Sequence, residues 1–339
     1  MSTSFDNLLS PINSSSGHAT NASASEPSVR FTNLFHLNNG DDIFECLNNN
    51  DGLSLYATHP IEDHFSDVLR KWNWAHIYCW GGLDQFNSIF ILTIYNDNII
   101  MCDWEGNVHF FAIDGTFLQQ WGGERSYPKK INKGKGIVVS LLDGNEVIII
   151  ADGWDYCIKV FSFEGELLSC WDKIPIIEHH TEFLEPTGIA VSPNKEEIFV
   201  SYMYGNIIKV FEPNGFCLKT LDITLKYPKS ISISDEGKVF ICNDNHVIVI
   251  DSDGKYIQRF GKMNNLLPIN IAVMGSRVLV TDMYQLYEFH TNGTLIRQLD
   301  LQINIQNPFI IQGISLSSNG NFVLHTCHNY IISGRISGL

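Results

Sequence analysis

The sequence has 339 residues, 44% of them hydrophobic, which is enough apolar material for the core of one large β domain plus a tail. Its formal net charge of −15 argues against a protein that mainly binds nucleic-acid phosphates, because such binding needs a basic surface. The eight cysteines form no Cys-x-x-Cys pair, and several stand within predicted strands, where a cysteine acts as a small buried hydrophobe. No apolar run is long enough to cross a membrane and no secretion signal is present, so we expect a cytoplasmic protein without a membrane segment.

The N-terminal part is predicted to differ from the rest of the chain. Residues 1–57 begin with a Ser/Asn/Ala-rich stretch and show no firm hydrophobic period, so we expect a disordered or irregular segment. Residues 58–73 are predicted to form a short amphipathic helix, because Pro60 suits a first helical turn and apolar residues recur at helical spacing up to Trp72. This helix is expected to pack against the domain that follows, at residues 74–339; a helix that binds a partner is the alternative.

The middle of the chain repeats a unit that is clearest at Asn145–Trp171. This stretch predicts three strands, Glu146–Ala151, Ile158–Phe163 and Glu166–Trp171, with a polar and aromatic corner between the first two. Such a unit cannot bury both of its faces alone, so its recurrence decides the fold.

The recurrence is marked by short turns and by one apolar position. Five turns place a glycine after an acidic or amide residue, which supplies the positive φ of a hairpin turn: Asp114-Gly115, Glu164-Gly165, Asn214-Gly215, Asp253-Gly254 and Asn292-Gly293. Six positions after each glycine stands a large apolar residue, which we call the marker: Trp121, Trp171, Leu221, Phe260 and Leu299. Successive units are 50, 50, 39 and 39 residues apart, which is the range of β-propeller blades.

The two ends of the domain complete the count of blades. Trp80, in a predicted strand at about residues 74–82, is a further marker, but no complete set of inner strands precedes it. At the C-terminus, Gly313–Ser317, Asn321–Thr326 and Asn329–Ser333 are predicted strands that lack a fourth. We therefore predict an all-β, six-bladed β-propeller of four-stranded antiparallel blades, in which the N-terminal strand completes the C-terminal blade and removes an exposed edge.

The repeated unit resembles the NHL repeat, whose core reads roughly hydrophobic–Ala/Thr–Asp, a polar turn, then Ile-x-Val-Phe. Val147–Phe161 carries the closest likeness, and three stretches match more loosely: Ile99–Phe111, Phe199–Phe211 and Val278–Phe289. The Asp that ends the second strand is kept as Asp103, Asp152 and Asp282, whereas other units have Ser201 and Asn243. The family's Asn-x-Arg is missing, so the resemblance is to a divergent member of the family. It implies a propeller over residues 74–339 and no particular function.

One end of the predicted propeller collects the features that bind partners. Antiparallel order places the corners between second and third strands at the same end as the blade-to-blade connections, including two inserts, residues 125–135 and Ile174–Glu185. Corner aromatics that are not needed for a core are typical interface anchors, although packing between neighbouring blades is the alternative for each of them. The predicted binding residues are the corner aromatics and two lysines of the first insert: Trp104, Trp154, Tyr156, Tyr202, Tyr204, Tyr284, Lys129 and Lys130.

Three functions are compatible with this surface. The first is a non-catalytic, monomeric scaffold that binds a protein or peptide, with no cofactor and no metal. The second is an RNA-binding module in which bases stack on the aromatics and the lysines of the first insert hold phosphates, which the net charge disfavours. The third is a metal-dependent lactonase- or lyase-like enzyme that recruits Asp152, His179, His180 and Glu182, although the inner strands do not begin with the expected His or carboxylate residues.

Overall fold

The computed structural model describes the following residues: 74–81, 86, 88–123, 129–172, 184–262, 266–283, 285–300, 310–327 and 329–336. The predicted irregular segment at 1–57 and the predicted helix at 58–73 lie outside this range and stay predictions. Within the described range, no helix is long and apolar enough to cross a membrane.

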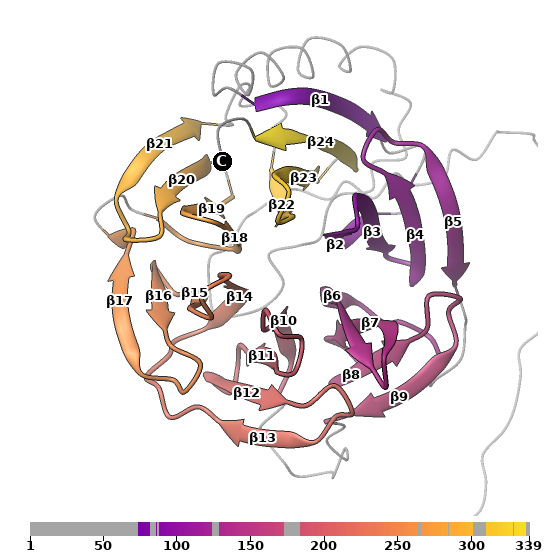
Figure 1. Ribbon diagram of the computed structural model, residues 1–339, viewed down its shortest axis with the longest axis horizontal. Coiled ribbons are helices and arrows are strands. Elements are labelled where there is room, and N and C mark those ends of the chain that lie inside the picture. The colour runs from indigo at the N-terminus through magenta and orange to yellow at the C-terminus, as the bar shows by residue number, and fades with distance from the viewer. Residues whose placement is uncertain are drawn as a thin grey trace, which may run out of the picture. The chain divides into compact units, whose positions relative to one another are not determined.

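Six sheets of four antiparallel strands form a ring, which confirms the predicted all-β six-bladed propeller (Figure 1). The first three blades in chain order contain β2 (Ile89–Tyr95), β3 (Asn98–Asp103), β4 (Asn107–Ala112) and β5 (Phe117–Gly122); β6 (Gly134–Leu142), β7 (Asn145–Asp152), β8 (Cys157–Phe161) and β9 (Leu167–Trp171); and β10 (Pro186–Val191), β11 (Ile198–Tyr202), β12 (Ile207–Phe211) and β13 (Cys217–Thr220). The next three contain β14 (Pro228–Ile233), β15 (Val239–Asn243), β16 (His246–Ile250) and β17 (Tyr256–Phe260); β18 (Asn270–Met274), β19 (Arg277–Thr281), β20 (Gln285–His290) and β21 (Leu295–Asp300); and β22 (Ile311–Leu316), β23 (Asn321–Thr326), β24 (Tyr330–Ile336) and β1 (Trp74–Gly81). We number these blades 1 to 6.

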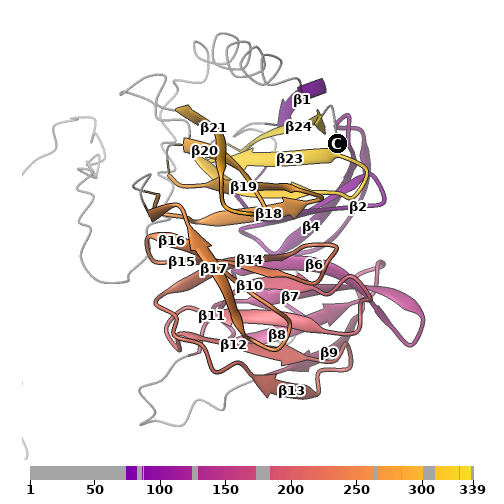
Figure 2. The ribbon, with the colours of Figure 1, turned by 60° about the vertical axis from the view of Figure 1, so that its left-hand side comes forward.

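Burial falls from the middle strands of a blade to its rim. The second and third strands are apolar along most of their length and are buried on both faces, because each blade is covered by a neighbour on either side; β7 and β15 are examples. The rim strands β5 and β13 are mostly exposed. Inner strands of successive blades lie side by side around the ring, and the turned view shows the blades of β10–β13, β14–β17 and β18–β21 following one another (Figure 2).

The ring is closed by a blade that combines strands from the two ends of the domain. β1 pairs antiparallel with β24 as the fourth strand of blade 6, with Cys79 opposite Ile332 and Trp80 opposite Ile331. The predicted closure by residues near 74–82 is therefore confirmed. It gives β24 a partner along its outer edge, which would otherwise be open to pairing with another chain.

The fixed spacing between turn glycine and marker has a physical cause in the contact between blades. Each of the five glycines has a φ between +86° and +90°, which an L side chain rarely adopts. A Cβ atom on each would lie within 3.3 Å of the marker of the preceding blade, in the pairs Gly115–Trp80, Gly165–Trp121, Gly215–Trp171, Gly254–Leu221 and Gly293–Phe260. The marker thus covers the next blade's turn, and glycine is required there for conformation and for space.

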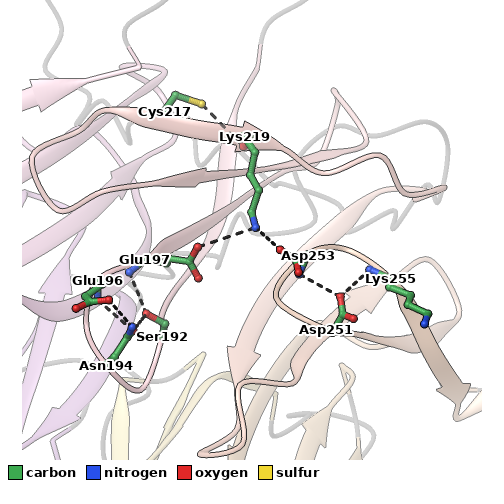
Figure 3. A network of polar contacts seen from close by, with 9 residues as sticks. All are labelled: Ser192, Asn194, Glu196, Glu197, Cys217, Lys219, Asp251, Asp253 and Lys255. Carbon is green, nitrogen blue, oxygen red and sulfur yellow. Dashed lines mark hydrogen bonds and ion pairs between the residues drawn. The ribbon is translucent and has the colours of Figure 1, made fainter.

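Polar contacts accompany the junction between blades 3 and 4. Lys219 on β13 forms ion pairs with Asp253 in the next blade's turn, at 2.9 Å, and with Glu197 in its own blade, at 4.0 Å (Figure 3). The Asp253 side chain is 84% exposed, and ion pairs of this kind contribute about 0–1 kcal/mol. The apolar marker contact is therefore the stronger link between these two blades.

Candidate functional site

The corners between second and third strands share one end of the propeller with the connections that enter the inner strands. The backbone N–H groups of four corners donate to a carbonyl one or two residues before the inner strand of the same blade, in the pairs Trp104–Ser88, Gly153–Lys133, Asp244–Lys226 and Cys327–Ile310, at 2.9 to 3.0 Å. We call this end of the propeller the corner face. These bonds tie the backbones of the four corners to the connections that enter the inner strands.

Two exposed tryptophans of blades 1 and 2 touch on the corner face. Trp104 and Trp154 are 47% and 44% exposed, and their rings meet edge to face with centroids 5.5 Å apart and planes at 82°. Phe90, at the start of β2, packs against Trp104 with ring centroids 5.0 Å apart. The Lys133 Nζ lies 4.8 Å from the Trp154 ring centroid and 6.0 Å from that of Trp104.

Beneath Trp104, the Asp that ends β3 binds its own corner and the following strand. The Asp103 carboxylate accepts hydrogen bonds from the backbone and side-chain N–H groups of Asn107, each at 2.9 Å, and lies 2.9 Å from Nε2 of His109. Asp103 and His109 are both buried. The recurrent Asp of the motif therefore stabilises the corner backbone instead of facing a ligand.

Beneath Trp154, a buried lysine ties the first insert to the corner of blade 2. The fully buried Lys159 Nζ donates to Asp152 at 2.8 Å, to Asp155 and to the carbonyl of Lys130, and the backbone N–H of Asn132 donates to Asp152 at 2.7 Å. Burial raises the pKa of Asp152, although the Lys159 ammonium opposes this. Burial lowers the pKa of Lys159, but the carboxylates of Asp152 and Asp155 outweigh it and the net shift is upward.

Tyr202, predicted as a binding residue, lies in the core. It is 1% exposed, its hydroxyl donates to Asp172, and the Lys209 Nζ lies 5.1 Å from its ring centroid and 2.7 Å from the Asp172 carboxylate. Burial, and then the neighbouring Asp172, raise the pKa of Tyr202. Tyr202 therefore packs between neighbouring blades, which was the alternative for each corner aromatic. We do not include Tyr202 in the candidate surface.

The other predicted residues occupy different positions on or near the corner face. Tyr204 is 43% exposed, whereas Tyr156 is half-buried with a φ of +50°. Lys129 is exposed and Lys130 is half-buried. Tyr284 lies outside the described residues. The structure thus brings Trp104 and Trp154 into contact and places Tyr204 on the neighbouring blade.

Two aromatic residues of this face were missed in the sequence. Tyr227, in the connection from blade 3 to blade 4, is 44% exposed, has a φ of +50°, and donates its N–H to Oδ1 of Asn206 at 2.7 Å. Phe90 was missed because it reads as part of a buried strand. A usable signal existed for Tyr227: it directly precedes Pro228, the strand-opening proline, and so belongs to a blade-to-blade connection.

The site shows no preformed metal centre in the part of the chain that can be described. No group of three or more His, Cys, Asp or Glu side chains is arranged there to hold a metal ion. Of the four residues considered for an enzyme, Asp152 is held by Lys159, and His179, His180 and Glu182 lie outside the described residues.

Comparisons with known proteins support the architecture. No family model and no curated protein sequence matches the chain. Its structure is similar to that of a streptogramin B lyase, with 14% identity and a TM-score of 0.57 over 77% of this chain and 99% of the other. A virginiamycin B lyase from Staphylococcus aureus has 13% identity and a TM-score of 0.54 over 76% of this chain and 98% of the other. A catalytically inactive form of that lyase with quinupristin has 14% identity and a TM-score of 0.55 over 76% of this chain and 98% of the other.

These similarities define the chain as a β-propeller and, at 13–14% identity, show the fold alone. The resemblance to the NHL family is not confirmed, since no family model matches.

Proposed function

We propose that this propeller is a non-catalytic scaffold that binds a protein or peptide partner across its corner face. The observation that carries the proposal is a series of exposed aromatic side chains on consecutive blades, which we call the aromatic arc: Trp104, Trp154, Tyr204 and Tyr227, each 43–47% exposed. Large, rigid aromatics with polar tips are the residues that most often dominate binding at protein interfaces.

The packing around the arc supports binding over a purely structural role. Each blade already has a closed core that excludes these four residues. The corner backbones that carry Trp104 and Trp154 are held by hydrogen bonds to the neighbouring connections, so these two corners would lose little backbone entropy on binding. A partner that covers the arc would therefore gain apolar contact at low cost.

The RNA-binding alternative is weakened by the positions of the lysines on the first insert. Lys133 is 6% exposed against the tryptophans, and the Lys135 Nζ lies 3.4 Å from the Glu185 carboxylate. Of the lysines in this insert, Lys129 alone is exposed. A continuous basic surface for phosphates is not formed by these residues, and we keep RNA as an outcome of the test.

The enzyme alternative has fold similarity behind it, because the similar structures are lyases. We do not propose it, because Asp103 and Asp152, the acids that end the second strands of blades 1 and 2, are buried and bound to His109 and Lys159. Carboxylates held in this way are poorly placed to ligate a metal or to transfer a proton to a substrate.

The test is affinity capture with a double variant of the arc, Trp154→Ala with Tyr204→Ala. Each truncation of an interface anchor costs about 2 kcal/mol or more of binding energy, so partner recovery should be lost while the thermal midpoint hardly changes. The matched control is Phe216→Ala with Tyr256→Ala, two rim residues that are 65% and 56% exposed and lie away from the corner face.

Recovery that persists in the arc variant, or is lost equally in the rim variant, contradicts the proposal. If the wild type no longer captures its partner after nuclease treatment, the corner face binds RNA and not a protein. Unfolding of the arc variant supports the packing role of these aromatics.

A further inference from the structure

The Lys133 ammonium lies beside two aromatic rings, those of Trp104 and Trp154, which contact each other edge to face. The ring planes are nearly perpendicular, at 82°, and the ammonium lies 4.8 Å and 6.0 Å from the two centroids. A cation within about 6 Å of an aromatic centroid is attracted by the ring quadrupole, and most strongly by tryptophan. Both tryptophans therefore interact with a cation that the protein itself supplies.

Lys133 occupies this position at a conformational cost. Its φ is +106°, in the region that favours glycine, and the residue is only 6% exposed. Strain of this kind costs about 1–3 kcal/mol and tends to occur at binding sites and switches. Its carbonyl accepts the N–H of Gly153 at 2.9 Å, which fixes the backbone beside Trp154.

We propose that Trp104 and Trp154 form an aromatic cage for an organic cation, which Lys133 fills in the unbound protein and a lysine or methylated lysine of the partner replaces. The proposal rests on the proposed function, since it names the chemistry of the partner residue that the aromatic arc receives. Both tryptophans keep more than two-fifths of their surface exposed, so a partner can reach their rings from the corner face, whereas the cation position opens only when the Lys133 side chain, 6% exposed, moves out. The net charge of −15 favours the approach of a cationic segment.

A second lysine of the propeller supplies a matched comparison. Lys195 also has a positive φ, +61°, and its Nζ lies 5.0 Å from an aromatic centroid, that of Tyr95. The structure gives this lysine a single aromatic wall, whereas Lys133 has two. Removing the Lys195 side chain should therefore create no comparable cage.

The experiment measures the binding of choline, with its uncharged isostere 3,3-dimethylbutan-1-ol as probe control, by tryptophan fluorescence and by ligand-observed NMR. Lys133→Gly, in which glycine suits the positive φ, should bind choline about tenfold more tightly than the wild type or Lys195→Gly, since one vacated cation–π site is worth about 1–2 kcal/mol. Adding Trp154→Ala to Lys133→Gly should abolish the gain, and the uncharged isostere should show none.

Three results overturn the cage: equal choline affinity in Lys133→Gly and Lys195→Gly, equal gains for choline and its isostere, or a gain that survives Trp154→Ala. Lys133→Ala gives the same comparison if glycine lowers the stability of the fold. Loss of partner capture in the arc variant together with no choline binding would leave the proposed function standing and refute the cage alone.

Discussion

His325 on β23 is a basic side chain enclosed by apolar blades. It is 0% exposed, and neither ring nitrogen has a hydrogen-bond partner among the described residues. Burial lowers the pKa of His325 from 6.5 to about 3. The nearby backbone of Phe90 raises this pKa and so opposes the effect of burial only in part. A Cβ on Gly313, opposite on β22, would lie 2.3 Å from Nε2, so the ring has no room to move toward the inner strand.

This environment predicts a specific loss of stability in mild acid. Because the folded pKa lies below the unfolded value, the contribution is complete above pH 6.5 and is lost as the pH falls from 6.5 toward 3. Between pH 7.5 and 5.0, the wild type should lose about 2 kcal/mol more unfolding free energy than His325→Leu, at roughly 1.4 kcal/mol per pH unit. Urea unfolding at both pH values measures the difference, and parallel curves for the two proteins would show that His325 does not titrate as a buried neutral ring.

Single residues also show why the site was only partly predictable from sequence. The aromatic corners are visible because each follows a strand within a few residues. Lys133 belongs to a different blade from Trp104, and its contact with both tryptophans depends on packing between blades, which no local pattern encodes. The burial of Tyr202 has a related cause: Asp172, which binds its hydroxyl, directly follows β9, the last strand of the preceding blade.

At the scale of the element, the hairpin between the third and fourth strands was the most predictable part of the fold. Its glycine and marker lie six residues apart in one strand and turn, so the signal is local and repeats. The sequence predicted the positive φ for the turn but gave no reason for the constant offset. The reason is non-local, because the marker of one blade covers the glycine of the next.

The two requirements on these glycines can be separated by experiment. Gly215 has a φ of +89° and its Cβ would lie 2.5 Å from Cγ of Trp171, whereas Gly144 has a φ of +80° and no described heavy atom within 4 Å of a Cβ. Gly144→Ala should cost about 1 kcal/mol of strain, and Gly215→Ala about 1–3 kcal/mol more because of overpacking. Denaturant unfolding of both variants gives the two values. Equal losses would mean that Trp171 yields without cost and that the marker contact is not a tight link.

At the scale of the whole molecule, stability depends on the pairing of β1 with β24. Cys79 and Ile332 are opposite each other in this pair, and both side chains pack on the same core cluster between blades 5 and 6. This arrangement allows the ring closure to be fixed by one covalent bond without altering any other blade.

Ile332→Cys is therefore predicted to form a disulfide with Cys79. Closing a loop of this length removes about 5 kcal/mol of unfolded-chain entropy, less any strain, so the oxidised variant should unfold at a clearly higher denaturant concentration than the same variant under reducing conditions. Ile331→Cys is the control, because its partner on β1 is Trp80 and no bond can form there. An oxidised variant that contains the bond but unfolds at the same concentration as the reduced one would show that strain in the folded state cancels the entropic gain, and so that Cys79 and Ile332 do not face each other as the pairing requires.

The closure also sets an order of events during synthesis. β1 is made before the strands of blades 1 to 5, and its partner β24 is made after all of them. Until β24 has been made, β1 has no partner strand for blade 6 and the ring is incomplete. The ring cannot close before β24 has been made, so its completion is expected to show the slow kinetics of pairings between distant segments.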